Sequence, residues 1–304
     1  MFDFRYFHIS LHIVIIIITD YTYEMSTVII IIVLISTFIH ALWNFSIKKS
    51  EYPFEFLQLL AVGSGLIAFP FGLYLFVNEK FSFYGILLAI ISGLIHVFYF
   101  YALGKAYEKG ELSIVYPIAR GTAVALVPII GILVIGEDIG LISIFGIIIV
   151  FIGIIILGGK SLFIVTNKKN ETILAIFVGL TITCYTIIDK LAVSFINPLF
   201  VFSISSFIGG FIPIMIIDRR INHFKHLIKL NYKFIFFISM CSTLAYPMIL
   251  YAYKLSSVSL VAPLREIATV HASILGIIIL KESVSKNKTI GIISIILGAI
   301  FIVL

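Results

Sequence analysis

The sequence predicts an all-α polytopic membrane protein, with ten transmembrane helices arranged as two five-helix repeats of inverted topology. Three observations predict it. Of the 304 residues, 61% are hydrophobic and 12% are charged, and the mean hydropathy is +1.20, so the chain carries more apolar surface than a soluble domain of this length buries. The apolar residues fall into ten long runs, and uncommon residue types recur at a fixed offset in the two halves.

The ten runs are joined by short connections. A helix needs about 20 residues to cross the hydrocarbon core, and it pairs its backbone groups within itself. The longest connection, at 218–233, leaves no room for a soluble domain. We expect helices at residues 26–47, 54–77, 82–106, 112–135, 139–158, 171–192, 197–217, 232–254, 258–280 and 287–304.

Residues 1–24 form an N-terminal extension ahead of the first expected helix. Its apolar run, residues 9–19, is short for a spanning helix, and no small-residue cleavage site of a secretory signal follows it. Either the functional chain starts at Met25 or the extension is a short membrane-embedded segment. We therefore expect a first repeat at 26–158 and a second repeat at 171–304.

Lysine and arginine are distributed unevenly among the connections. The connections after the first, third, fifth, seventh and ninth helices hold 15 of them, and the other four hold 3. By the positive-inside rule, the first set is cytoplasmic, and Met25 and Leu304 lie outside. The net charge of +6 forms no continuous basic stripe, so we expect a multi-pass protein of the cytoplasmic membrane and no nucleic-acid partner.

The two halves match at an offset of 145 residues, which indicates an internal repeat. Each copy holds five expected helices, an odd number, so the copies lie in the membrane with opposite orientations. Transporters of this architecture bind substrate where the repeats meet, near the midplane. The matched pairs are Pro53 with Pro198, Gly65 with Gly210, Tyr101 with Tyr246, Arg120 with Arg265, Gly131 with Gly276, Glu137 with Glu282, Gly146 with Gly291 and Gly153 with Gly298.

Arg120 and Arg265 each lie in an otherwise apolar stretch, IVYPIARG and LVAPLRE. An arginine deep in lipid costs at least ~2.5 kcal/mol, so neither is expected to face lipid. One interpretation is that both face a shared aqueous pocket, where they bind a carboxylate or phosphate. The other is that each holds a neighbouring helix through backbone carbonyls or through Glu266.

A proline precedes each of these arginines, and the pairs Ser113 with Ser259 and Pro117 with Pro263 match at an offset of 146. Proline cannot donate a backbone hydrogen bond, so the carbonyls of Ser113 and Ser259 lose their intrahelical partners. A kinked or broken helix is expected at both places. Such a break persists at membrane depth where the freed groups line a wet cavity or meet another polar group.

Three further charged residues are candidates for coupling transport to an ion. Glu266 follows Arg265 directly, so the two do not face each other on a helix, and its expected partner is Arg120 or Lys190. A buried carboxylate beside an arginine could carry a proton, and Asp189 is a second candidate. A static ion pair is the alternative for Glu266, and snorkelling to the surface is the alternative for Lys190.

Polar and aromatic residues on the expected helices could form the walls of a pocket for a small organic solute. The alternative for each is an interfacial aromatic belt or a hydrogen bond between helices. The candidates are His40, Trp43, Asn44, His96, Tyr99, Tyr101, Tyr185 and Tyr246.

The sequence contains no HExxH, GxSxG or GxxxxGK[ST] motif and no cysteine pair at metal-binding spacing. These absences argue against a zinc protease, a serine hydrolase and an ATP-driven pump. We therefore expect no enzymatic activity, no cofactor and no metal ion.

The segments HALWN at 40–44, YALGKAYEKGELSIVYPIARG at 101–121 and YAYKLSSVSLVAPLRE at 251–266 resemble the EamA-type branch of the drug/metabolite transporter superfamily. The resemblance covers residues 26–304. It implies a ten-helix inverted-repeat carrier that moves small metabolites, often outward, by alternating access. Unlike the four-helix multidrug relatives, the first helix carries no glutamate, so an anion or zwitterion is expected rather than a lipophilic cation. Well-studied ten-helix members place both termini in the cytoplasm, opposite to the charge distribution here.

The expected function is therefore a secondary transporter for a small polar, anionic or zwitterionic metabolite, with proton- or exchange-coupled export. Two alternatives remain at the level of sequence. A flippase for a lipid-linked substrate would need a lateral opening between helices. A membrane ligand sensor or subunit would bind a solute without moving it. The sequence gives no oligomeric state.

Overall fold

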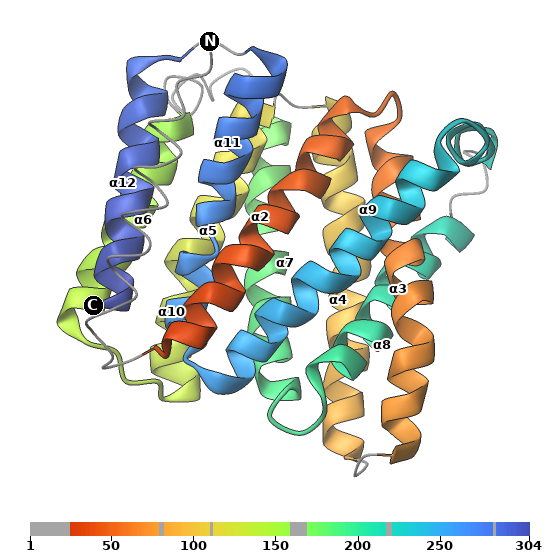
Figure 1. Ribbon diagram of the computed structural model, residues 1–304, viewed down its shortest axis with the longest axis horizontal. Helices are drawn as coiled ribbons and strands as arrows, with labels where there is room; N and C mark the ends of the chain where they lie inside the picture. The colour runs from red at the N-terminus through yellow and green to blue at the C-terminus, as the bar shows by residue number, and fades with distance from the viewer. Residues whose placement is uncertain (1–24, 79–81, 110–111, 159–168, 217–220, 282–283) are drawn as a thin grey trace.

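The computed structural model of the chain describes residues 25–78, 82–109, 112–158, 169–216, 221–281 and 284–304, and these residues are helical apart from short connections (Figure 1). The N-terminal extension, 1–24, lies outside the described residues. The first repeat contains α2 (Thr27–Lys49), α3 (Pro53–Asn78), α4 (Phe83–Lys109), α5 (Leu112–Ile130), the π-helical turn η1 (Gly131–Ile135) and α6 (Leu141–Gly158). The second contains α7 (Lys169–Ala192), α8 (Pro198–Ile216), α9 (Ile221–Leu255), α10 (Val258–Leu264), α11 (Ile267–Leu280) and α12 (Lys286–Val303).

Nine segments of the described residues are long and apolar enough to cross a membrane. One of them joins α5 to η1, and another joins α10 to α11. The tenth membrane helix is α2, which has 23 residues, of which Thr27–Trp43 form its apolar part. The predicted fold class, an all-α polytopic membrane protein with ten transmembrane helices in two inverted repeats, is confirmed.

The helix ends follow local signals in the sequence. Ser26 and Ser285 cap α2 and α12, because their side-chain oxygens accept hydrogen bonds from the backbone N–H groups of Ile29 and Lys288. The matched prolines Pro53 and Pro198 occupy the first positions of α3 and α8, where proline's missing N–H removes no helical hydrogen bond.

Helix packing follows a pseudo-twofold pattern. Two helices of the first repeat pack on the helices that correspond to them in the second: α3 packs on α8, and α6 packs on α12. The most extensive of the other contacts between the repeats come in exchanged pairs: α4 packs on α8 as α9 packs on α3, α4 on α7 as α9 on α2, and α5 on α7 as α11 on α2. In Figure 1, α6 and α12 lie side by side at one edge, and α2 and α9 cross the front of the molecule. This exchange of partners is what two inverted repeats produce.

The helices of the two repeats lie close together at glycines that the offset of 145 pairs. A Cβ added to Gly65 in α3 would lie 2.8 Å from the backbone N of Phe207, and one added to Gly210 in α8 would lie 2.6 Å from the backbone N of Val62. The two contacts are symmetry mates, because Val62 and Phe207 are also 145 residues apart. Small residues at such crossings let helix backbones pack closely in a membrane. The corresponding glycines between α6 and α12 are Gly146, Gly153, Gly291 and Gly298.

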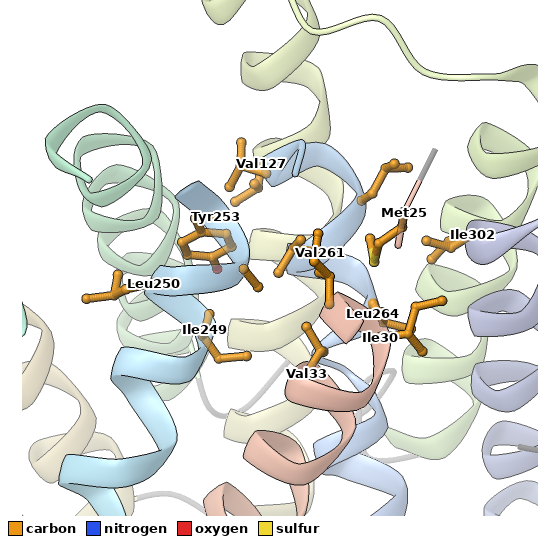
Figure 2. Close-up of a cluster of buried hydrophobic side chains, with 14 of the residues drawn as sticks. Met25, Ile30, Val33, Val127, Ile249, Leu250, Tyr253, Val261, Leu264 and Ile302 are labelled. Atoms are coloured by element: carbon orange, nitrogen blue, oxygen red, sulfur yellow. The ribbon is translucent and has the colours of Figure 1, made fainter. Parts of the chain in front are cut away.

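The short helix α10 lies in the largest cluster of buried apolar side chains (Figure 2). Its residues Val261 and Leu264 are at most 2% exposed. Side chains of α2, α5, α9 and α12 surround it in Figure 2. The residues that follow α10 therefore lie inside the bundle rather than at its lipid-facing surface.

The helix break expected after a proline occurs in the second repeat. There, α10 ends at Leu264, the residue after Pro263, and α11 begins at Ile267. Arg265 and Glu266 lie between the two helices. In the first repeat, α5 runs through Pro117 without interruption, and the irregular turn is η1, after Ile130. The two repeats are thus alike in overall packing but differ at this point.

The expected connection at 218–233 is partly helical, which corrects the sequence interpretation. Residues 221–230 form a first segment of α9, and Asn231, with φ −134° and ψ 22°, separates it from the long segment that follows. Phe224 and Leu227 are buried on one side of this first segment, and Lys225 and Lys229 are exposed on the other. The buried and exposed positions recur with the period of an α-helix, so this charged stretch forms an amphipathic helix.

Candidate functional site

Arg120 of α5 and Arg265 at the α10–α11 break line the same cavity, although they come from opposite repeats. The two residues are 7% and 5% exposed, so neither is presented to lipid. The cavity volume is about 10 Å³, which is room for roughly one water molecule. Its walls are Arg120, Ala123, Val124, Val127, Ile182, Thr186, Ala262, Arg265 and Glu266.

Arg120 is held by both carboxylate oxygens of Glu266. Its Nη2 lies 2.6 Å from Oε1, and its Nε donates to Oε2 at 3.1 Å. Thr269 also donates to Oε2, at 3.3 Å. A two-point pair of this kind is the strongest geometry that a guanidinium makes with a carboxylate. Of the two partners expected for Glu266, the structure brings it to Arg120, and the pair links α5 to the start of α11.

Arg265 contacts two tyrosines of α9. Its Nη1 donates to the Tyr253 hydroxyl at 2.7 Å, and its guanidinium carbon lies 5.5 Å from the centre of the Tyr246 ring. The ring face carries partial negative charge, so it attracts the cation. Within the described part of the chain, the Arg265 side chain is therefore held beside the cavity by aromatic groups rather than by a carboxylate.

Asp189 of α7 is fully buried and lies behind these tyrosines. One carboxylate oxygen accepts from the Tyr246 hydroxyl at 2.7 Å, and the other accepts from Ser92 Oγ of α4 at 2.5 Å. Tyr246 therefore contacts Asp189 through its hydroxyl and Arg265 through its ring. Together, these contacts join the carboxylate of Asp189 in α7 to the guanidinium of Arg265 at the α10–α11 break.

An aromatic cluster continues from this point. The His96 ring stacks on Tyr185 with centroids 4.2 Å apart, and Tyr99 lies edge-on to Tyr185 at 5.3 Å. Tyr246 is 6.1 Å from His96 and 6.3 Å from Tyr185. Nδ1 of His96 lies 2.8 Å from the Ser92 carbonyl oxygen. The structure therefore brings together four of the predicted aromatic or histidine candidates, next to Asp189.

Lys190 and Glu137 stabilise the connection between α9 and α10 through hydrogen bonds to its backbone. The ammonium group of Lys190 donates to the carbonyls of Tyr253 and Ser256 at 2.7 and 2.8 Å, at the C-terminus of α9. The Glu137 carboxylate accepts from the backbone N–H groups of Val258 and Ser259 at 2.7 and 2.9 Å, at the start of α10. The two side chains lie 3.8 Å apart. Charges of this sign at these helix ends are stabilising, so the geometry gives Lys190 a structural contact with the end of α9.

The remaining predicted residues are dispersed. His40 accepts a hydrogen bond from Trp43 Nε1 at 3.0 Å, and both arginines act on it electrostatically. Tyr101 is 47% exposed and packs edge-on against Phe54, so the structure does not bring it to the cavity. The Ser259 hydroxyl lies 3.4 Å from the Pro128 carbonyl. The side chains of Asn44 and Ser113 lie outside the described residues.

Besides Thr269, sequence reasoning missed three polar residues of this region. Tyr253 is seven residues after Tyr246, and Ser92 is four before His96, so each shares a helix face with a predicted candidate. Thr186 lines the cavity and lies three residues before Asp189, again on one face. Helical spacing from the chosen residues would have found all three.

Metal binding has no support within the described part of the chain. No group of three or more histidine, cysteine, aspartate or glutamate side chains is placed there to hold a metal ion. The polar groups that line the cavity are two guanidinium groups, a hydroxyl and a carboxylate. Such a set suits hydrogen bonding to an anion better than coordination of a cation.

Comparison with known proteins follows the same two-part division of the chain. A family model described as the EamA-like transporter family matches residues 27–159 and again 170–304. No curated protein matches the sequence. A solved structure described only as "Crystal structure of protein" is similar, with a TM-score of 0.69 and 14% identity over 90% of this chain and 95% of that one; at that identity, the likeness concerns the fold alone. Because this family model matches nearly the whole chain, once per repeat, the protein belongs to the EamA-like transporter family of multi-pass membrane transporters.

Proposed function

We propose that the protein is a secondary transporter that exports a small anionic or zwitterionic metabolite across the cytoplasmic membrane by alternating access, coupled to protons or to exchange. One observation carries the proposal: Arg120 and Arg265, one from each repeat, line a single cavity between the repeats. Inverted-repeat transporters place their substrate sites at such an interface. Two buried guanidinium groups would bind the carboxylate or phosphate group of the substrate.

The local chemistry supports an anionic group over a cation. The carboxylate in the cavity wall, Glu266, already lies against Arg120, so a cationic substrate would compete with a bound guanidinium. The apolar part of the wall, Val124, Val127 and Ile182, suits a substrate that carries hydrocarbon beside its charged group. A small amphipathic anion or zwitterion fits both properties.

Transport requires this cavity to enlarge. In the conformation described, its volume of about 10 Å³ is far below the roughly 300 Å³ of a typical small-molecule site. The α10–α11 break adjoins the cavity and offers a point where the backbone can bend, because Arg265 and Glu266 belong to neither helix. Opening toward one side and then the other would expose the arginines alternately.

A ligand screen across several chemical classes tests the proposal. Purified protein would be melted with a library of small carboxylates, phosphates, zwitterions and cations, at two pH values. We expect anions or zwitterions to raise the Tm of the wild type, because a ligand that binds the folded state stabilises it. The Arg120→Gln/Glu266→Gln double variant, which loses the pair but keeps the buried charge balanced, should not respond to them.

Flux in reconstituted vesicles then separates transport from binding alone. A ligand from the screen should cross wild-type vesicles and fail to cross those with the double variant. Binding without flux in the wild type would favour a sensor or subunit. Movement of long-chain lipid substrates, with none of water-soluble ones, would favour a flippase. A Tm shift of the same size in the double variant and in the wild type would contradict the role of Arg120.

A further inference from the structure

The Glu266 carboxylate binds the guanidinium of Arg120 in the way that the carboxylate of a ligand would. Its two oxygens meet Nη2 and Nε of the guanidinium at 2.6 and 3.1 Å, and the residue is only 2% exposed. It lies at the α10–α11 break, as the residue before Ile267. A carboxylate on a helix break can move away from its partner with less backbone disruption than one inside a helix.

Thr186 supplies a second, independent observation in the same wall. The residue is fully buried, lines the cavity, and its Oγ1 has no hydrogen-bond partner among the described residues. The other buried threonines of α7 behave differently. Thr181 donates to the Val178 carbonyl at 2.7 Å, and Thr183 donates to the Gly179 carbonyl at 2.9 Å. A buried hydroxyl without a partner is uncommon and calls for an explanation, and a bound acceptor would provide one.

The charges around the cavity balance as they stand. With both carboxylates ionised, Arg120 and Arg265 contribute two positive charges, and Glu266 and Asp189 contribute two negative ones. An incoming carboxylate that displaces Glu266 from Arg120 would leave one negative charge in excess in a site that excludes water, which is unfavourable unless that charge is neutralised. Among the described residues, the titratable and charged groups in contact with this site are Arg120 from α5, Asp189 from α7, Tyr246 and Tyr253 from α9, and Arg265 beside Glu266. His40 from α2 and Tyr185 from α7 lie within electrostatic reach of both arginines.

We propose that Glu266 is an internal competitor for Arg120: the substrate carboxylate displaces it, accepts a hydrogen bond from Thr186, and leaves Glu266 to take up one proton. This inference rests on the proposed function and adds its coupling. The proton comes from the aqueous solution on the open side of the membrane. It converts the Glu266 carboxylate to the neutral acid, while the substrate remains ionised. One carboxylate and one proton then cross together, and the closed site keeps its charge balance.

Acetate, the simplest carboxylate that carries a methyl group, is the probe. Its affinity for the purified protein would be measured by calorimetry or thermal shift at about pH 6 and about pH 8, where acetate is ionised, with chloride making up a constant ionic strength. The wild type should bind acetate more tightly at the lower pH, because the proposed exchange takes up one proton as acetate binds. Glu266→Gln should bind about tenfold more tightly than wild type at the higher pH, with a weaker dependence on pH than the wild type, because the proton acceptor of the exchange is gone.

Matched variants give each residue its own control. Thr186→Val should weaken acetate binding several-fold in the wild-type and Glu266→Gln backgrounds, whereas Thr183→Val, which removes a hydroxyl already bonded within α7, should not. Glu55→Gln alters another buried carboxylate, distant in the chain and bonded to His223, and should leave acetate affinity and its pH dependence as in the wild type.

The outcomes separate the two proposals. If anions from the ligand screen bind the wild type but bind Glu266→Gln no more tightly, the competitor role is wrong and the proposed function stands. If Thr186→Val matches Thr183→Val, the part assigned to Thr186 is wrong. If neither acetate nor any anion or zwitterion of the screen binds wild type or Glu266→Gln, both proposals fail.

Discussion

At the scale of single residues, the buried charged side chains of this bundle contact specific polar partners, and removing one side chain should affect its partner. Arg120→Gln would leave the Glu266 carboxylate buried without its guanidinium. Breaking a buried pair in this way costs about 3–5 kcal/mol of folding free energy, whereas removing both charges costs much less. We expect the single variant to lose thermal stability in detergent and the Arg120→Gln/Glu266→Gln variant to regain most of it. Equal stability of the two variants would show that the pair is not formed.

A second residue-scale prediction concerns Glu137. Its carboxylate accepts hydrogen bonds from the first two N–H groups of α10 and lies near Lys190. Glu137→Gln should lower unfolding free energy by about 1–2 kcal/mol, because hydrogen bonds to a charged acceptor and the helix-end charge are both weakened. Asp138→Asn, at the exposed neighbouring position, is the control and should change the melting temperature little. A similar loss in both variants would contradict the capping role.

The candidate site could be predicted in part at this scale. Arg120, Arg265 and Glu266 were recognisable because charge is expensive at membrane depth, so these residues had to meet polar groups. Tyr253 and Thr186 were not, because a tyrosine or threonine in a membrane helix is ordinary in composition. Their roles depend on which helix face turns toward the cavity, and that is set by packing with the other repeat. Tyr101 was predicted as one of the aromatic walls of the pocket, and it matches Tyr246 at the offset of 145, but the match did not give it the same surroundings.

At the scale of helices, the inverted repeats make equivalent contacts without having identical shapes. Both proline–arginine stretches suggested a break, yet α10 and α11 are separate and α5 is continuous. A proline removes a single hydrogen bond, and a helix can continue past it when its neighbours hold both parts in line. The ends of most helices were predictable to within a few residues, because caps, prolines and the limits of apolar runs mark them. The helical segment 221–230 was missed because its charge was interpreted as a loop.

The glycine crossing between α3 and α8 leads to an element-scale prediction. In Gly210→Ala, the new methyl group would lie 2.6 Å from the backbone N of Val62, so the helices must separate. We expect a loss of about 1–3 kcal/mol in unfolding free energy, as for other overpacked sites. Gly121→Ala is the matched control, because its nearest neighbours would be 3.7 Å away. Comparable melting temperatures for both variants would argue against the close α3–α8 contact.

At the scale of the whole molecule, the sequence determines the repeat and its inversion, because an odd number of spans per copy forces opposite orientations. The absolute orientation rests on the distribution of lysine and arginine alone. We predict that the connections at 48–52 and 217–233 face the cytoplasm and that Leu304 lies outside. Single cysteines in those segments, labelled in intact cells with a membrane-impermeant thiol reagent, would test it. Labelling of the 217–233 connection from outside would contradict this orientation.

In the proposed transport cycle, the arginines of the two repeats face one chamber that opens to water. The most direct measurement is the reaction of Val124→Cys with a charged thiol reagent in vesicles, in a background where Cys184 and Cys241, both free thiols, are replaced by serine. Val124 lines the cavity and is 2% exposed, whereas the control, Val178, is fully buried and packs in a separate apolar cluster. We predict that the cysteine at 124 reacts, that a transported ligand changes its rate, and that the cysteine at 178 does not react. Failure of both cysteines to react under every condition would contradict the account.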